Sequence, residues 1–213
     1  MKCRAVAALY CALMLVMGTV DAATQSARDV VKSTADNVLE RIIKDREELE
    51  SHPERIYDLI NELVIPHFDF QSMSRWVLGT TWKDASEAQR DAFIEQFKTL
   101  LVRTYAKALL EYSDEEIKYL DTTESANAKL VTVSTEMRGG GGASVIPINY
   151  RLHAPDGGEW KVVDVTVDGI SLISTYRGSF RSEINKNGLD SLIVKLTERN
   201  ENLATTLTEA PAE

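Results

Sequence analysis

Residues 160–172, "WKVVDVTVDGISL", mark the junction on which the fold depends. Val163, Val165 and Val167 alternate with other side chains, and this period of two predicts a β-strand with one apolar face. Gly169 ends the alternation, and from Leu172 onward apolar residues recur at helical spacing. The stretch therefore predicts a strand that turns directly into a helix, and it contains no histidine and no metal-ligand spacing.

Three earlier runs predict further strands, at residues 129–137 and 144–152 and, as a short edge strand, at 116–120. The glycines at 139–142 and the later "PDGG" segment have the composition of hairpin turns. With the strand at 159–167, these runs predict an antiparallel meander that buries one face. We expect its buried residues to be Val131, Val133, Ile146, Ile148, Tyr150, Val163, Val165 and Val167.

Apolar residues at helical spacing predict helices on both sides of this sheet. Asp69 and Gly79 are expected to cap the two ends of one helix, and Ser86 with Gln89 forms the capping box S-x-x-Q of the longest. The predicted helices are 28–51, 54–64, 70–78, 87–111, one that carries Leu172, Tyr176, Phe180 and Ile184, and one at 189–198.

The order of the predicted elements indicates the fold class. Helices followed by strands and then by more helices are typical of an α+β fold. We expect N-terminal and C-terminal helices packed on a curved antiparallel sheet of about four strands, enclosing an apolar pocket. The longest predicted helix has an apolar stripe. It consists of Phe93, Phe97, Leu100, Leu101 and Ala108, with Tyr105 beside it.

The N-terminus has the pattern of a signal peptide. Lys2 and Arg4 precede a short apolar run, and small residues predict cleavage after Ala22. Cys3 and Cys11 would leave with residues 1–22, so the mature chain would have no thiol for catalysis or metal binding. We expect one folded domain at residues 23–199, a flexible tail at 200–213 and export to the periplasm.

The chain is acidic, with 24 basic against 33 acidic residues and a net charge of −9. Removal of residues 1–22 takes away Lys2, Arg4 and Asp21, leaving 22 basic against 32 acidic residues and a net charge of −10. This charge argues against nucleic acid as a partner and against tight adhesion to anionic membranes.

Catalytic interpretations compete with structural ones at several residues. His67 and Asp69 could form an acid–base pair, but residues two apart on a helix face different ways and Asp69 is the expected cap. His52, His67 and His153 have no spacing that indicates a metal site. The glycines at 139–142 indicate a flexible hairpin tip rather than a phosphate loop, because no P-loop lysine follows.

Asp164 and Asp168 lie opposite the valines of their strand. Alternation predicts that both face solvent, while the alternative is a general base in a cone-shaped pocket. Arg177 is expected to pair with one of these carboxylates, or to meet a phosphate at a pocket mouth.

Four motifs occur in order along the chain: "PHFDF" at 66–70, "LGTTW" at 78–82, "FKTLLVRTYA" at 97–106 and "DVTVDGISL" at 164–172. Together they resemble the MlaC proteins of the toluene-tolerance (Mla) family, which are periplasmic phospholipid-binding proteins. The resemblance extends from about residue 28 to about residue 198. Several separate motifs in the right order are more specific than any single one.

The resemblance implies a soluble, non-enzymatic periplasmic carrier whose lipid-binding domain is residues 23–199. Such proteins hold lipid tails in a deep apolar pocket, with bound phospholipid as cargo and no cofactor or metal. They pass phospholipid between an outer-membrane lipoprotein–porin complex and an inner-membrane ABC transporter that carries an MCE-domain protein, touching the membrane complexes only transiently. The glycines at 139–142 depart from the family pattern and leave partner choice open.

A pocket that contacts acyl chains requires aliphatic and aromatic side chains, which ordinary cores also use. Three alternatives stay open: a sterol or hopanoid as cargo, an enzyme that uses Asp164 or Asp168, and an adaptor with a fully packed core. The predicted lining residues are Val64, Phe70, Met73, Val77, Phe97, Leu101, Tyr105, Val133, Ile148, Val165, Val167, Leu172 and Phe180.

Overall fold

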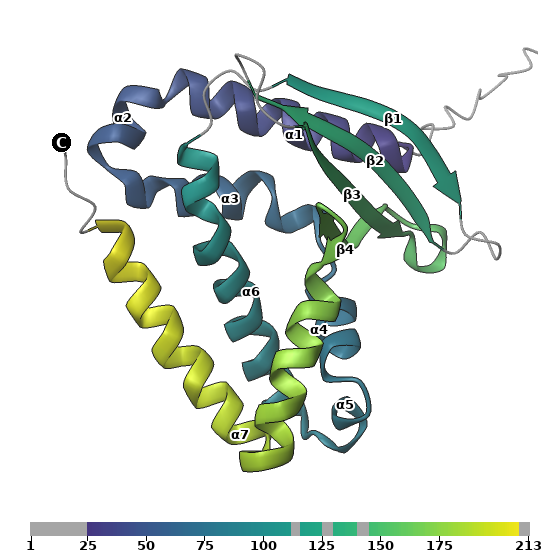
Figure 1. The fold of residues 1–213 in the computed structure, drawn as a ribbon, viewed down its shortest axis with the longest axis vertical. Coiled ribbons are helices and arrows are strands. Elements are labelled where there is room, and N and C mark those ends of the chain that lie inside the picture. The colour runs from purple at the N-terminus through teal and green to yellow at the C-terminus, as the bar shows by residue number, and fades with distance from the viewer. Residues whose placement is uncertain (1–24, 112–115, 125–129, 140–144, 209–213) are drawn as a thin grey trace, which may run out of the picture.

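The computed structural model describes residues 25–111, 116–124, 130–139 and 145–208 (Figure 1). The predicted signal peptide with both cysteines, most of the glycine tip and the last residues of the tail lie outside the described residues. None of the helices in the described ranges is long and apolar enough to cross a bilayer.

Helices form most of residues 27–110 of the described chain. In order they are α1 (Ala27–Lys44), α2 (Arg46–Ser51), α3 (Ile56–Leu63), α4 (Phe70–Leu78), α5 (Thr81–Asp84) and α6 (Glu87–Leu110), with 3₁₀ turns at Pro53–Arg55 and Ile65–His67.

The predicted caps are confirmed. The Asp69 side chain accepts a hydrogen bond from the Ser72 N–H at the start of α4. Gly79 ends the same helix with a φ of 58°, a conformation that favours glycine. Ser86 and Gln89 form the predicted capping box of α6. These local hydrogen bonds explain why the boundaries of α4 and α6 could be read from the sequence.

Two helix predictions are wrong in detail. The helix expected at 28–51 is two helices, because the backbone leaves the helical region at Asp45, whose N–H still bonds to the Arg41 carbonyl. On α6 the buried alanine is Ala106 and not Ala108, which is exposed. The reason is a change of partner, since the C-terminal half of α6 packs against α1–α3 while its first half packs against α4 and α7.

The sheet is antiparallel throughout, with strands in the order β1-β2-β3-β4-β5. It has five strands where about four were expected: β1 (Glu116–Glu124), β2 (Val131–Arg138), β3 (Val145–His153), β4 (Lys161–Val167) and the two-residue β5 (Ile170–Ser171). The β4–β5 turn holds Asp168 at φ 49° and Gly169 at φ 78°, so it needs residues that tolerate a left-handed backbone.

The chain ends in α7 (Leu172–Thr208). As expected, Gly188 divides it, with a φ of 85° and a ψ of 171°. The final helical segment runs to Thr208 and not to 198, and Asn200 is buried, donating hydrogen bonds from its side-chain amide to Gln96 of α6. The segment predicted as a tail therefore begins as part of this helix.

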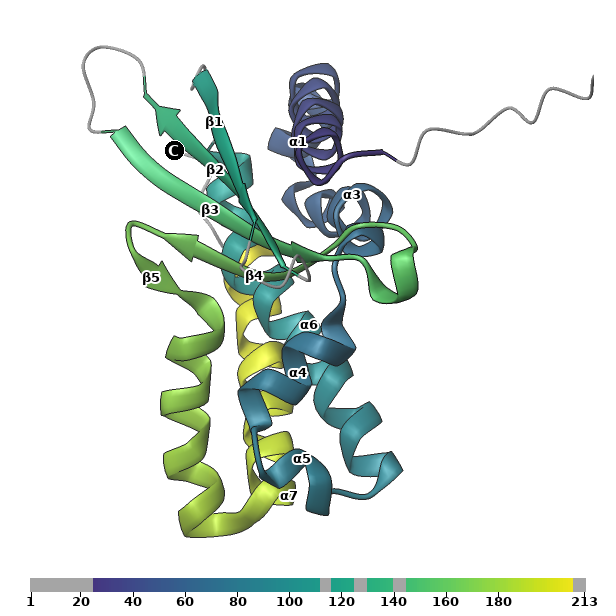
Figure 2. The ribbon, with the colours of Figure 1, turned by 90° about the vertical axis from the view of Figure 1, so that its right-hand side faces the viewer.

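Within the described residues, the buried apolar side chains form three clusters. The bundle cluster joins α4, α6 and α7, the second cluster joins α1–α3 to the end of α6, and the sheet cluster lies between the start of α1 and strands β2–β4. Figure 2 shows the bundle at one end of the molecule and the sheet with α1 and α3 at the other.

The connection at residues 64–69 joins these parts. Ile65 packs against the bundle and the second cluster, and Phe68 packs against the bundle and the sheet cluster. The Asp69 N–H donates to the Val162 carbonyl of β4 at 2.9 Å, and His153 Nε2 of β3 lies 2.8 Å from Asp69 Oδ2. Asp69 thus caps α4 and holds it against the sheet.

We predict that Asp69 makes stability sensitive to acid. Burial alone would raise the pKa of Asp69, but hydrogen bonds from Ser72 and His153 outweigh it and lower the pKa. The unfolded carboxyl, with a pKa of about 3.9, binds protons first, so this contribution is full above that pH and is lost as the pH falls through the lower folded pKa.

The measurement is urea unfolding of the wild type, Asp69→Asn and Asp91→Asn from neutral pH down to about pH 3. Below about pH 5 the free energy of unfolding should fall less steeply in Asp69→Asn than in the wild type. The exposed Asp91 of α6 is the control and should leave the slope unchanged. Equal slopes in all three proteins would contradict the role given to Asp69.

Candidate functional site

Asp164 is a structural residue of the β4–α7 junction. Only 2% of its surface is exposed, and its carboxylate accepts hydrogen bonds from the Ser171 hydroxyl (2.8 Å) and the Ile173 N–H (3.2 Å). The prediction that Asp164 faces solvent is wrong, because the β4–β5 turn folds the start of α7 back onto this face of the strand. The carboxylate therefore stabilises the N-terminal end of α7.

Arg177 was expected to pair with Asp164 or Asp168, but the structure shows no ion pair between Arg177 and either carboxylate. The cation nearest Asp164 is Arg151, whose Nη1 lies 3.8 Å from Asp164 Oδ2. Arg177 places its guanidinium beside Gly79, and Asp168 is exposed in the β4–β5 turn. Alternation of β4 puts Asp164 on the face opposite Val165, so a general base aimed at the valine face has no support.

The histidine expected to pair with Asp69 is not the one that does so. Asp69 pairs with His153, which lies 84 positions away in sequence, and not with His67. Burial and the nearby charge of Lys161 lower the pKa of His67. Within the described ranges there is no group of three or more His, Cys, Asp or Glu that could hold a metal ion.

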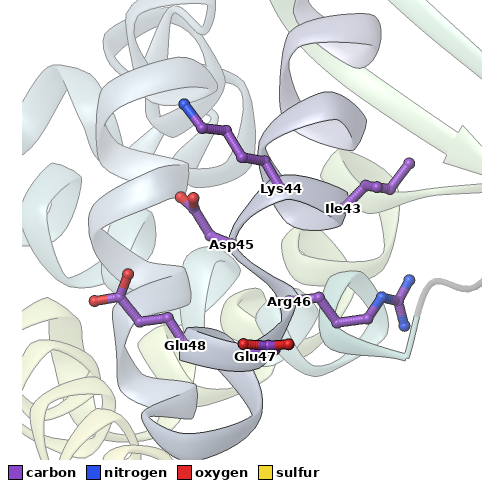
Figure 3. Close-up of a pocket in the computed structure, with 6 residues that line it drawn as sticks. All are labelled: Ile43, Lys44, Asp45, Arg46, Glu47 and Glu48. Atoms are coloured by element: carbon purple, nitrogen blue, oxygen red, sulfur yellow. The ribbon is translucent and has the colours of Figure 1, made fainter.

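Two hollows lie beside the turn from α1 to α2, with volumes of about 440 and 140 Å³. The larger is lined by residues 43–48, where only Ile43 is apolar (Figure 3). The smaller is lined mainly by charged side chains of α1–α3. Neither contains a predicted lining residue, and neither has the surface that an acyl chain requires.

The face of the sheet that carries Val133 and Val165, here called the inner face, is the candidate site. At one end, Val131, Leu152 and Val162 lie side by side on β2, β3 and β4. All three are buried, and they pack against Ala27, Val30 and Val31 of α1. This end of the inner face is ordinary core.

The same apolar face continues towards the other end, where burial decreases. Ile117, Met137 and Ile146 lie side by side on β1–β3, and all are half-buried. In the next row Ile148 and Val167 are half-buried and Ile170 is 64% exposed. We call these six residues the open end of the inner face. An apolar surface that extends beyond its helical cover is typical of a ligand or partner site.

Tyrosine hydroxyls lie along this surface. Burial raises the pKa of Tyr119 to about 12 and also raises the pKa of Tyr150, whose hydroxyl bonds to Thr135. These two hydroxyls stay neutral at physiological pH and add no charge to the apolar surface. Tyr105 of α6 lies elsewhere: it is 40% exposed, and burial and a hydrogen bond with Tyr176 of the bundle raise its pKa to about 12.

The structure distributes the predicted lining residues over several places. Val64 packs against the second cluster, Val133 and Val165 belong to the sheet cluster, Ile148 and Val167 lie at the open end, and Tyr105 is exposed. Most of the others form the bundle core, so their role as lining remains a prediction. Those in or against the bundle core are Phe70, Met73, Val77, Phe97, Leu101, Phe180 and Leu172.

Sequence reasoning missed the open end as a unit. Ile117, Met137 and Ile170 were not candidates, and Ile146 was expected to be buried. Cross-strand register brings these residues together, and one chain's alternation does not reveal which strand positions lie opposite one another. The connection residues Ile65 and Phe68 were also missed, although they belong to a conspicuous apolar run, "VIPHFDF".

A protein-family model described as "MlaC protein" matches residues 32–198. The chain belongs to the MlaC family. Among relatives of this MlaC-family chain, the toluene tolerance protein ttg2D of Pseudomonas putida is 32% identical over 169 residues, which are 79% of this chain and 77% of that protein. The intermembrane phospholipid transport system binding protein MlaC of Haemophilus influenzae is 25% identical over 79% of both chains.

A solved structure shows the same fold. It is that of a phospholipid-binding protein from Ralstonia solanacearum in complex with a phospholipid, with 29% identity and a TM-score of 0.77. The match covers 84% of this MlaC-family chain and 99% of that one. The predicted family and the α+β fold class are confirmed.

Asp164→Ala should destabilise the fold. The substitution leaves the Ser171 hydroxyl and the Ile173 N–H without their acceptor, so we expect a loss of about 1–3 kcal/mol in the free energy of unfolding. Asp168→Asn, which keeps a side chain that tolerates the turn, should change it by less than about 0.5 kcal/mol. Urea unfolding measures both, and equal effects would contradict the assignment of Asp164 as a cap.

Proposed function

We propose that this MlaC-family chain is a soluble periplasmic carrier that binds phospholipid by its acyl chains. The observation that carries the proposal is the match, over most of both chains, to a phospholipid-binding protein in complex with a phospholipid. The names of the two relatives, one for toluene tolerance and one for intermembrane phospholipid transport, support the same function.

The acyl chains would lie against the open end of the inner face. Its six side chains are apolar and incompletely covered, and the neighbouring Val165 and Leu172 are half-buried. The predicted lining residues of the bundle would contact the chains if the sheet and the bundle move apart at the connection 64–69. Such a cavity would hold tails by dispersion contacts without a charged partner.

The energetics favour exchange over tight capture. Two chains of about sixteen carbons exposed to water would cost on the order of 25 kcal/mol, at about 0.8 kcal/mol per methylene. A protein surface of valine, leucine and isoleucine replaces one hydrocarbon environment with another, so the net change on leaving a bilayer is near zero. Uptake and release are then both accessible, as a carrier requires.

The carrier would exchange phospholipid with an outer-membrane lipoprotein–porin complex and with an inner-membrane ABC transporter that carries an MCE-domain protein. The predicted signal peptide supports periplasmic location, and the acidic net charge supports transient contact with membranes. Asp164 and Asp69 stabilise the fold, which supports a carrier over an enzyme.

The direct test is the lipid content of protein isolated from the periplasm of its native host. Native mass spectrometry should show a bound mass, and solvent extraction should identify it as phospholipid. A sterol or hopanoid in the extract would overturn the proposed cargo. Ligand-free protein, with no extractable lipid, would overturn the carrier itself.

Ile148→Glu should abolish lipid retention, because a carboxylate on the inner face would lose its hydration beside acyl chains. The matched control is Asn149→Glu, the next residue of β3, which faces the opposite side of the sheet. We expect at most about a tenth of the wild-type lipid in Ile148→Glu and unchanged lipid in Asn149→Glu, measured on protein whose circular dichroism matches the wild type. Equal lipid in the two variants would contradict the proposed site.

A further inference from the structure

Three exposed arginines on α4 and the first half of α7 have no ion-pair partner in the described part of the chain. Along α1–α3 and the sheet, cations such as Lys32, Arg55 and Lys161 form ion pairs with carboxylates. By contrast, Arg75 of α4 and Arg177 and Arg181 of α7 have no carboxylate within 4.0 Å in the described part of the chain, as is also true of scattered cations such as Lys44 and Arg199. The three arginine side chains are exposed.

The three residues lie within about one helical turn of the contact between Arg177 and the end of α4. A Cβ at Gly79 would be 3.5 Å from Arg177 Nη2, so the Arg177 guanidinium lies against the end of α4. Arg75 is one turn earlier on the same side of α4, since the Gly79 N–H bonds to the Arg75 carbonyl, and Arg181 is one turn after Arg177. Figures 1 and 2 both show α4 beside the first half of α7. We call these three arginines the arginine face.

Helix dipoles explain this arrangement only in part. The negative end of α4 accounts for a cation at Arg75 or Arg177, because both lie at its last turn. Arg181 lies in the body of α7, where no helix end requires a cation. Like charges without counter-charges repel one another, and a partner that supplies carboxylates would remove this repulsion.

We propose that the arginine face is a docking surface for an acidic patch on a protein partner. Guanidinium groups bind carboxylates through two parallel hydrogen bonds, which suits a specific protein contact. This face shares no residue with the open end of the inner face, so a partner could dock while lipid is bound. The inference does not depend on the identity of the cargo.

An anionic membrane fits the arginine face less well. Membrane-surface segments combine cations with apolar side chains that insert between lipids. The exposed large apolar residues of the described chain are Ile43, Tyr105, Val145, Ile170 and Val194, and none lies on α4, α5 or the first half of α7. The net charge of −9 also opposes adhesion to an anionic bilayer.

The test uses a short poly-L-glutamate peptide as a probe for acidic protein surfaces, titrated into ¹⁵N-labelled protein. An acidic protein should repel this peptide unless a local cationic face binds it. We expect amide shift changes confined to α4 and the first half of α7. The affinity should fall at physiological ionic strength, where the Debye length is about 8 Å.

Variants separate this face from other cations. Arg181→Glu, alone and together with Arg75→Glu, should lower the affinity for the peptide by at least about tenfold. The control Arg199→Glu, an exposed cation in the second half of α7 also without an ion pair in the described residues, should bind as the wild type does. Arg181→Glu is the informative variant if the double substitution impairs folding.

Three results would overturn the proposal: peptide binding that maps to the sheet or to α1–α3, wild-type affinity in Arg181→Glu, or no peptide binding at low salt. Sedimentation with vesicles that contain phosphatidylglycerol, if lost in Arg181→Glu, would assign the face to lipid instead. The lipid content of Arg181→Glu should equal that of the wild type, so failure here is distinguishable from failure of the proposed carrier function.

Discussion

The attachment of the helical bundle to strand β4 is the constraint on which the rest of the structure depends. One joint is at Val162, whose carbonyl accepts the Asp69 N–H while Asp69 caps α4. The other is at Asp164, which accepts the Ser171 hydroxyl and the Ile173 N–H at the start of α7. Because both joints lie on β4, the bundle is anchored at one side of the sheet while β1–β3 extend away from it (Figure 2).

This attachment explains the uneven cover of the inner face. Helix α1 buries the end that carries Val131 and Leu152, while the open end with Met137 and Ile148 stays half-buried. The two carboxylates that could suggest catalysis, the half-buried Asp69 and the buried Asp164, form these attachments to β4. The open end of the inner face remains as an incompletely covered apolar surface with neutral tyrosine hydroxyls beside it. Such a surface suits a cargo that is recognised by its hydrocarbon part.

Local patterns predicted much of the fold. Alternation located β2, β3 and β4, and the short run at 116–120 marked the first part of β1, which extends to Glu124. Capping chemistry located the start of α6 and both ends of α4, because these signals act between residues a few positions apart. The errors lie where distant segments meet. The assignment of Asp164 to solvent was wrong because α7 folds back onto its strand. The choice of Ala108 as a buried residue was wrong because α6 changes packing partners along its length. The pairing of Asp69 with His153 was missed because the two residues are 84 positions apart.

The candidate site was less predictable than the fold for the same reason. Ile148 and Val167 were chosen from strand alternation, but Ile117, Met137 and Ile170 join them only through cross-strand register. The composition of a core and of an acyl-chain site is the same, so residue type alone does not separate Phe97 in the bundle from Ile148 at the open end.

In the proposed carrier, acyl chains of bound phospholipid contact the open end of the inner face. The most direct measurement is a set of nuclear Overhauser effects between protein methyl groups labelled with ¹³C and the acyl protons of bound phospholipid. We expect such contacts to the methyls of Ile148, Val167 and Met137. Lipid-bound protein that shows acyl contacts only to methyls elsewhere, such as the exposed Ile43 or Val194, would contradict this expectation.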